Sequence, residues 1–139
     1  MDRGTKIYAI ILGITCTFLA IVFLYETPKV RELNNQLESI SEINDFPYRF
    51  KVLRINNGIA TLNSPISTEL PCGNVIAIIF PSIKGKSLLS EEYQQARELL
   101  ARVQTHAGNI VKSDPDVNKI AWELDRSWLI QNGVTFNNL

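Results

Sequence analysis

Histidine and cysteine are scarce in this sequence, and their scarcity excludes several kinds of chemistry. A zinc site takes three or four histidine, cysteine or carboxylate ligands at compatible spacings, and the single histidine, His106, has no such set near it in the chain. Cys16 falls inside a long apolar run, so we expect no disulfide between it and Cys72. Cys72 is then a lone thiol, which either packs in the interior or pairs with another molecule.

A net charge is also lacking, since 14 basic residues balance 14 acidic ones. Proteins that bind nucleic acid through its phosphates need a basic surface, so we expect no nucleic-acid partner. No serine lies in the Gly-x-Ser-x-Gly turn that presents a hydrolase nucleophile. The sequence therefore predicts no catalytic residue, no cofactor and no metal ion, and we expect that the protein is not an enzyme.

What the sequence does contain is a long apolar run near its start. Residues 7–25 carry no charge, and a helix of about 20 residues crosses the ~30 Å hydrocarbon core of a bilayer. Tyr8 and Tyr25 lie near its ends, where amphipathic rings favour the headgroup layer. A cleaved signal peptide usually has a shorter apolar region that ends at small residues. We therefore expect residues 1–6 to be an N-terminal tail and residues 7–25 to be a permanent transmembrane helix.

The charges beside this run do not fix its orientation in the membrane. Arg3 and Lys6 on one side are matched by Lys29 and Arg31 on the other, so the positive-inside rule gives a tie. The free amine of the short tail favours an N-terminus on the inside. We expect a single-pass protein of the bacterial inner membrane, with its N-terminus cytoplasmic and its soluble domain periplasmic.

A stripe of small side chains along the apolar run is typical of membrane helices that pair. Such residues are spaced by four, three and four positions, which allows two helices to approach closely. After Pro28, apolar residues again recur at helical spacing, and this juxtamembrane stripe either pairs with a partner or lies along the domain. The predicted helix-pairing interface, for a second copy or another subunit, consists of Ala9, Gly13, Cys16, Ala20, Val30, Leu33, Leu37 and Ile40. The alternative is ordinary lipid-facing sequence.

Residues 26–45 are expected to form a juxtamembrane amphipathic helix and a linker, and residues 46–139 a soluble α+β domain. Alternating apolar and basic residues from Tyr48 indicate a half-buried strand, and Asn57-Gly58 predicts a type I′ turn that closes a hairpin. The pairs expected across this turn are Ile55 with Ala60 and Leu53 with Leu62. The continuous apolar run 75–80 predicts a central strand buried on both faces.

The second half of the domain begins with a long helix, expected from Ser87 or Ser90 to between Gly108 and Lys112. Its apolar face consists of Leu89, Tyr93, Ala96, Leu100, Val103 and Ala107. The final segment reads either as one helix or as a strand followed by a helix. Because only the second reading buries both tryptophans, we expect a strand through Leu124 and a short helix from Asp125 to Gly133. The predicted order is β-β-β-α-β-α, with a mostly antiparallel sheet and helices on one face.

Two groups of residues resemble ligand sites but have simpler interpretations. Residues 80–87 align with the phosphate-binding pattern Gly-x4-Gly-Lys-Ser, yet Phe80 replaces the first glycine and Pro81 removes an amide donor. We therefore interpret this segment as a plain turn before the helix. Five basic residues form either a patch for anionic lipid headgroups or, as we prefer, a charged strand face: Arg49, Lys51, Arg54, Lys84 and Lys86.

These observations lead to two functional hypotheses. The first is a single-pass membrane-anchored interaction or assembly protein, an accessory subunit of an envelope complex, held by the bilayer and by a protein partner or a second copy. The second is a membrane-anchored sensor or small-ligand-binding module whose pocket lies between the sheet and the long helix. A well-packed space at that position would argue against the second.

Overall fold

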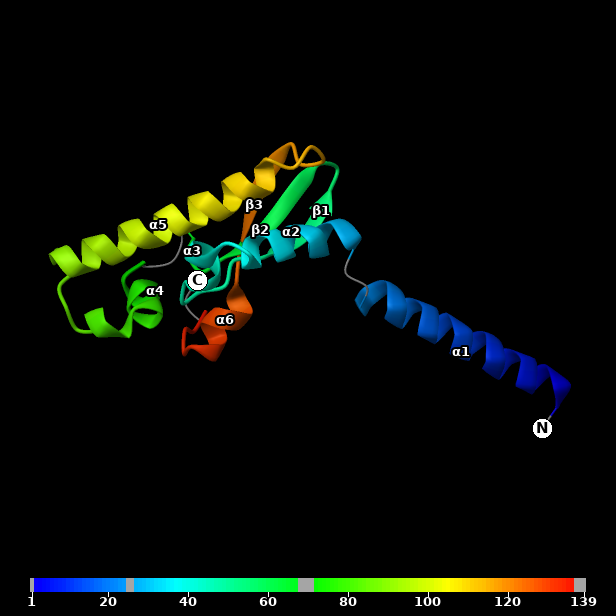
Figure 1. Cartoon of the computed structure of the whole chain (residues 1–139). Helices are drawn as coiled ribbons and strands as arrows, with labels where there is room; N and C mark the ends of the chain where they lie inside the picture. The colour runs from blue at the N-terminus through cyan, green and yellow to red at the C-terminus, as the bar shows by residue number, and fades with distance from the viewer. Residues whose placement is uncertain (1, 25–26, 68–71, 137–139) are drawn as a thin grey trace.

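In the computed structural model, which describes residues 2–24, 27–67 and 72–136, the first helix projects away from everything that follows it (Figure 1). This helix, α1, spans Arg3–Leu24. Its segment Arg3–Val22 is long and apolar enough to cross a membrane, and none of it is buried against the rest of the chain. The predicted apolar N-terminal helix of membrane-spanning length is confirmed. It begins at Arg3, so most of the expected tail is helical, while Tyr25 lies outside the described residues.

The rest of the described chain mixes helices with a small sheet, as the α+β prediction required. In chain order the elements are α2 (Pro28–Glu38), α3 (Ser41–Asn44), β1 (Val52–Asn56), β2 (Ile59–Ser64), α4 (Cys72–Ile79), the 3-10 helix η1 (Pro81–Ile83), α5 (Glu91–Lys112), β3 (Lys119–Leu124) and α6 (Arg126–Gln131). The described sheet has three strands in the order β1-β2-β3, of which the first pair is antiparallel and the second parallel. The predicted order and the mostly antiparallel character are thus only partly correct.

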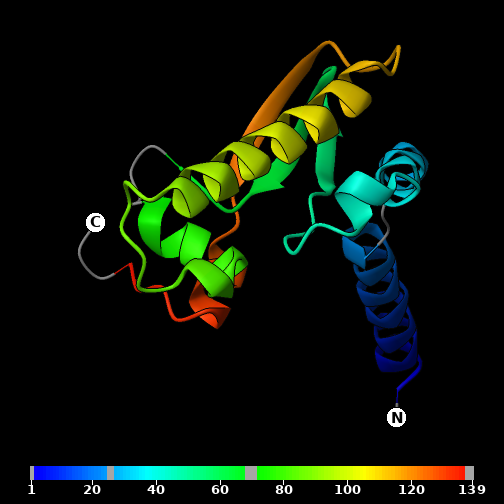
Figure 2. The ribbon, with the colours of Figure 1, turned by 60° about the vertical axis from the view of Figure 1, so that its left-hand side comes forward.

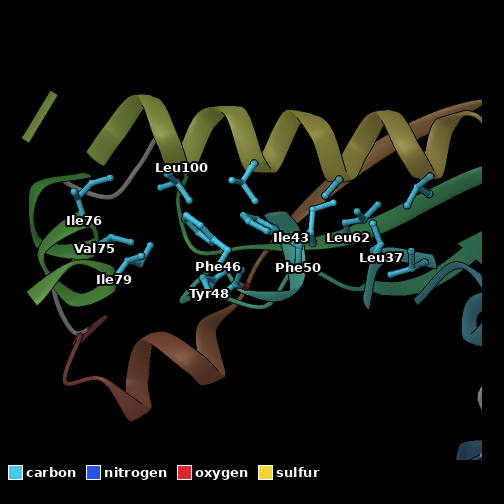
Figure 3. Packing of buried hydrophobic residues seen from close by; sticks show 14 of the residues in the cluster. Leu37, Ile43, Phe46, Tyr48, Phe50, Leu62, Val75, Ile76, Ile79 and Leu100 are labelled. Carbon is cyan, nitrogen blue, oxygen red and sulfur yellow. The ribbon is translucent and has the colours of Figure 1, made fainter. Parts of the chain in front are cut away.

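The run 75–80 is not a strand, and that prediction was wrong. Its residues 75–79 belong to α4, which buries Val75, Ile76 and Ile79, and Phe80 follows the helix. These positions lie on one side of a helix because they are separated by one and three residues. Figure 3 shows all three side chains pointing into the interior below Leu100 of α5. Since a short run without polar residues has no visible period, periodicity cannot distinguish a buried strand from a buried helix.

The hairpin forms at the predicted turn but with a shifted register. Asn57 and Gly58 have φ angles of 50° and 76°, as a type I′ turn requires, and Ile55 lies opposite Ala60. The register then shifts, so that Val52 rather than Leu53 pairs with Leu62. One extra residue in a strand exchanges its two faces. Consequently, Val52 is buried, whereas Leu53 is exposed on the other face.

The C-terminal prediction is confirmed in its elements. Asp125 caps α6 by accepting a hydrogen bond from the Trp128 amide, and β3 precedes it. Trp128 is half-buried, but Trp122 remains 38% exposed because β3 is an edge strand. Helix α5 crosses one face of the sheet (Figure 2) and packs against β2 and β3. The side chains at this contact are fully buried, among them Ala60, Leu62, Val103 and Ala107.

The helix after α1 belongs to the packed domain. Val30, Leu33 and Leu37 of α2 are buried in the same hydrophobic cluster as the sheet and α5. Figure 3 shows Leu37 and Ile43, from α2 and α3, in one layer with Phe46, Phe50 and Leu62 beneath α5. The packing of the domain thus begins at α2, upstream of residue 46, and the expected linker is part of it.

Candidate functional site

The small-residue stripe of α1 lies on an open surface. Ala9, Gly13, Cys16 and Ala20 are all exposed, and a Cβ added at Gly13 would meet nothing within 4 Å. Ala9, Gly13 and Thr17 line a shallow depression of about 470 Å³ along the helix, whereas Cys16 and Ala20 lie beside it. The hydroxyl of Thr17 donates to the Gly13 carbonyl at 2.8 Å, which satisfies it within the helix. Such internal pairing is what a polar group needs in hydrocarbon.

The structure does not join the juxtamembrane half of the predicted interface to this surface. Val30, Leu33 and Leu37 are 3%, 0% and 1% exposed inside the domain, and Ile40 is half-buried against the same core. Of the two possibilities for this stripe, lying along the domain is the one observed. Side chains that already fill the core are not available to a partner, so the surface left for helix pairing is that of α1.

The sheet face opposite α5 forms a second open surface. A depression of about 860 Å³ on it is lined by residues from all three strands and from the start of α6, including Lys51, Arg54, Thr61, Asn63, Ala121, Glu123, Asp125 and Arg126. The Arg54 guanidinium lies 2.7 Å from the Glu123 carboxylate, which links β1 to β3 across the central strand. Thr61, which lies opposite Arg54 on the central strand, is only 9% exposed.

A hydrogen-bonded cluster lies at one end of this depression. The Asn63 side chain accepts from the Lys51 amide at 2.7 Å and donates to the Arg49 carbonyl at 3.0 Å, in addition to the backbone bond from the Asn63 amide to the Lys51 carbonyl. The Tyr48 hydroxyl donates to the Asp125 carboxylate at 2.9 Å. Burial and this carboxylate raise the pKa of Tyr48 well above its usual range. The cluster therefore holds a neutral phenol and fixes the start of α6 against the strands.

The segment that resembles a phosphate loop is a turn. Residues Pro81–Ile83 form η1, and Gly85 adopts a φ of +85° in open space. Lys86, the residue that would contact phosphate, lies 3.2 Å from the Glu92 carboxylate instead. The pKa of Glu92 is lowered by its own backbone amide and by this lysine. The cation of the pattern thus already has an acidic partner.

Most of the polar residues singled out from the sequence are engaged in ion pairs. Arg49 lies 3.6 Å from Glu38, and Arg54 pairs with Glu123, so the basic set does not act as one cationic patch. The His106 Nδ1 atom lies 3.0 Å from Glu42 on the surface. Within the described residues no group of three or more histidines, cysteines or carboxylates is arranged to hold a metal ion. The Cys72 side chain lies outside the described residues.

Lys29 and Asp114 join the start of the domain to the turn before β3. The Lys29 ammonium lies 3.0 Å from both Asp114 and Asp116. The Asp116 amide and Lys29 lower the pKa of Asp114, and the two carboxylates raise that of Lys29. The sequence does not indicate this link, because Lys29 and Asp114 lie far apart in the chain.

Comparison of the chain with known protein families, with curated proteins and with solved structures found no match.

Proposed function

We propose that this chain is a single-pass, membrane-anchored, non-enzymatic interaction or assembly protein, an accessory subunit of an envelope complex. The observation that carries the proposal is the contrast between α1 and the domain. The domain buries most of its apolar side chains in one cluster, while α1 exposes an apolar surface of membrane-spanning length along its described residues. An apolar surface of that size is stable only in lipid or against a partner.

The attachment of the domain supports this role. Helix α2 starts at Pro28, capped by Thr27, and is packed into the core through Val30. The anchor therefore leads almost directly into a folded element, and the domain is held close to the bilayer. We place the chain in the bacterial inner membrane, with its N-terminus cytoplasmic and its domain periplasmic. A partner would then meet both α1 and the domain surface near the membrane.

Replacing small residues on α1 tests whether this helix pairs. In the G13L/A20L variant we expect loss of co-purification with the partner and loss of crosslinking through Cys16, because bulky side chains keep helices apart. The matched control, T15L/V22L, adds bulk on the opposite side of the helix and should leave association unchanged. Equal association of wild type and G13L/A20L would overturn helix pairing through this stripe.

A cysteine at the exposed position Leu89, which is 89% exposed, tests the sidedness of the domain. In a C16A/C72A background, L89C should react with a membrane-impermeant maleimide added to cells whose outer membrane has been permeabilised. Labelling only after lysis of the inner membrane would place the domain in the cytoplasm. Extraction of the chain by alkaline carbonate without detergent would contradict a permanent anchor.

The second candidate function, a sensor or small-ligand module, now has a different site. The space between the sheet and α5 is filled by side chains, so the expected pocket is not at that position. The depression on the opposite face remains. Arg54 in it is already paired with Glu123, so Lys51 and Arg126 are the lining cations that favour an anionic ligand. A panel of organic phosphates and carboxylates should then raise the melting temperature of wild type and less that of R126A. No shift with any of them would remove this alternative.

A further inference from the structure

The outer edge of β3 has unpaired backbone groups. Strand β3 is the last in the sheet and bonds to β2 on one side only (Figure 2). The Lys119 amide donates to Gly58, just before β2, and the Asp125 amide donates to Ser64 at the end of β2. In a parallel ladder alternate residues bond to the same neighbour, so Ile120, Trp122 and Leu124 direct their amides and carbonyls outward. Among the residues that the structure describes, none bonds to these outward groups.

We propose that the edge of β3 pairs with β3 of a second copy, antiparallel and centred on Ala121. Two such strands continue both sheets into one, with a two-fold axis between the two Ala121 residues. The proposal rests on the role as an interaction protein and specifies one partner for it. It deepens that role by assigning the contact to the soluble domain in addition to the membrane helix.

The hydrogen-bonding parity of the strand selects this register. In an antiparallel pair, a residue whose amide and carbonyl point outward must face a residue of the second copy whose groups also point outward. Because such residues alternate along β3, the two-fold axis must pass through a residue and not between two residues. In the register centred on Ala121, Ile120 faces Trp122 of the second copy, and the backbone amides and carbonyls of both residues point outward. Ala121 then faces its own copy in a pair without hydrogen bonds, where side chains approach most closely and a small residue is needed.

Charge complementarity supports the same register. Lys119 lies opposite Glu123 of the second copy, and symmetry forms this pair twice. Lys119 is exposed and has no ion-pair partner among the described residues, whereas Glu123 is 47% exposed beside Arg54. An axis through Trp122 would place Glu123 against Ala121, and an axis through Glu123 would place two like charges face to face. Only the register centred on Ala121 pairs opposite charges and keeps apolar residues together.

The side chains on the other face of β3 fit the same contact. Trp122 packs on Phe50 with ring centroids 6.2 Å apart, yet it is 38% exposed on an edge strand. Pairing with Ile120 of the second copy would cover this exposed aromatic surface. Aromatic residues opposite β-branched ones stabilise antiparallel pairs. The edge therefore offers backbone groups, two complementary charges and an apolar pair in one self-complementary segment.

Charge exchange in the full-length protein tests the register. In detergent or nanodiscs, K119E should weaken the dimer about tenfold, because two attractive pairs become repulsive. Because E123K alone would place two cations together at Arg54, the compensating variant is R54E/K119E/E123K. It should restore dimerisation, since each pair is again attractive with the order reversed. The matched control K112E changes an exposed lysine on α5 and should leave the dimer intact. A dimer insensitive to K119E, or one that the compensating variant does not restore, would overturn this register.

Disulfide crosslinking provides the second measurement. In a C16A/C72A background, A121C should form a disulfide-linked dimer on mild oxidation, because residues facing each other in such a pair are within bonding distance. The control E123C should not crosslink, since its counterpart lies on the far side of the axis. A monomeric protein without an A121C crosslink would overturn the β3 dimer alone. It would leave the proposed membrane interaction role to be judged by the α1 variants, so the two failures are distinguishable.

Discussion

The carboxamide of Asn34 pairs with the backbone of Val52 as a neighbouring strand would. It donates to the Val52 carbonyl at 3.1 Å and accepts from the Val52 amide at 2.7 Å. Asn34 lies on α2 and Val52 begins β1, so the helix covers the outer edge of the sheet at this point. Edge strands expose unpaired backbone groups, and native proteins cover them to avoid unwanted pairing. This edge is closed, whereas the edge at β3 is open.

Removing the Asn34 side chain should destabilise the domain. We expect N34A to lower the free energy of unfolding by about 1–3 kcal/mol, because two hydrogen bonds are lost and the Val52 groups lose their partner. The matched control N35A changes an exposed neighbour on the same helix and should have little effect. Urea unfolding in detergent, followed by tryptophan fluorescence, measures both variants. Equal midpoints for the two would show that the Asn34 pair contributes nothing.

Gly58 and Gly85 both have positive φ angles, and comparing alanine variants at the two positions distinguishes the effect of backbone strain from that of steric contact. G58A and G85A should each cost about 1–2 kcal/mol, because alanine disfavours the left-handed region. At Gly58 the new Cβ would also lie 2.5 Å from the Asn118 Nδ2 atom, whereas at Gly85 it would meet nothing within 4 Å. We therefore expect G58A to be the more destabilising variant. Adding N118A should remove the difference, and its persistence in G58A/N118A would contradict the contact.

Gly108 allows Trp122 to pack on α5. A Cβ at this position would lie 3.1 Å from the Trp122 Cζ2 atom, so a larger side chain must displace the indole. We expect G108L to cost about 1–3 kcal/mol and to change the tryptophan emission spectrum. The control A101L places a leucine at an exposed position of α5 and should change stability by less than about 0.5 kcal/mol. Identical emission spectra for G108L and wild type would contradict the prediction.

The ion pair between Lys29 and Asp114 should make stability depend on acid pH. The pKa of Asp114 lies below its ordinary value of 3.8 in the folded chain, so its ionised form stabilises the fold. This contribution is fully present above about pH 4 and is lost as the pH falls through the folded pKa. We expect D114N to lower the urea midpoint at pH 7 and to match wild type more closely at pH 3.

The neighbouring lysine provides the control for this pH dependence. K29M should resemble D114N at pH 7, because it removes the cation that lies 3.0 Å from Asp114. K112M removes an exposed lysine on α5 and should leave both midpoints unchanged. If D114N were equally destabilising at pH 3 and pH 7, the effect would come from packing rather than from charge.

Several elements were predictable because their signals are local. The turn at Asn57-Gly58 follows from the φ angles that only a few residues adopt, and Ser90 and Asp125 cap α5 and α6 as expected for their side chains. The apolar face of α5 from Tyr93 to Ala107 is buried as its spacing indicated, but Leu89, which was expected on the same face, precedes the helix and is 89% exposed. The membrane-length helix was also evident, since it depends only on length and composition.

The rest depended on contacts between distant segments. The parallel pairing of β2 with β3 and the assignment of 75–80 to a helix are set by what packs around them, which a single sequence does not display. The bulge at Leu53 exchanges the faces of the sheet to which the residues of β1 point, and no glycine or proline marks it in the sequence. The sequence indicated the exposed stripe of α1 but not the open face of the sheet. It also included the apolar residues of α2 in the pairing surface, because their place in the core is visible only in the structure.

The parallel pairing of β2 and β3 has a consequence for synthesis and proteolysis. The two strands meet only after the whole of α5 has been made, and closing such a long loop is slow compared with forming the hairpin. A nascent or truncated chain that ends before Lys119 would therefore fold the hairpin of β1 and β2 but leave the other edge of β2 unpaired and open to pairing with other chains. The last 21 residues of the chain, from Lys119 onward, thus protect the molecule against aggregation, because β3 covers the edge of β2 along its whole length.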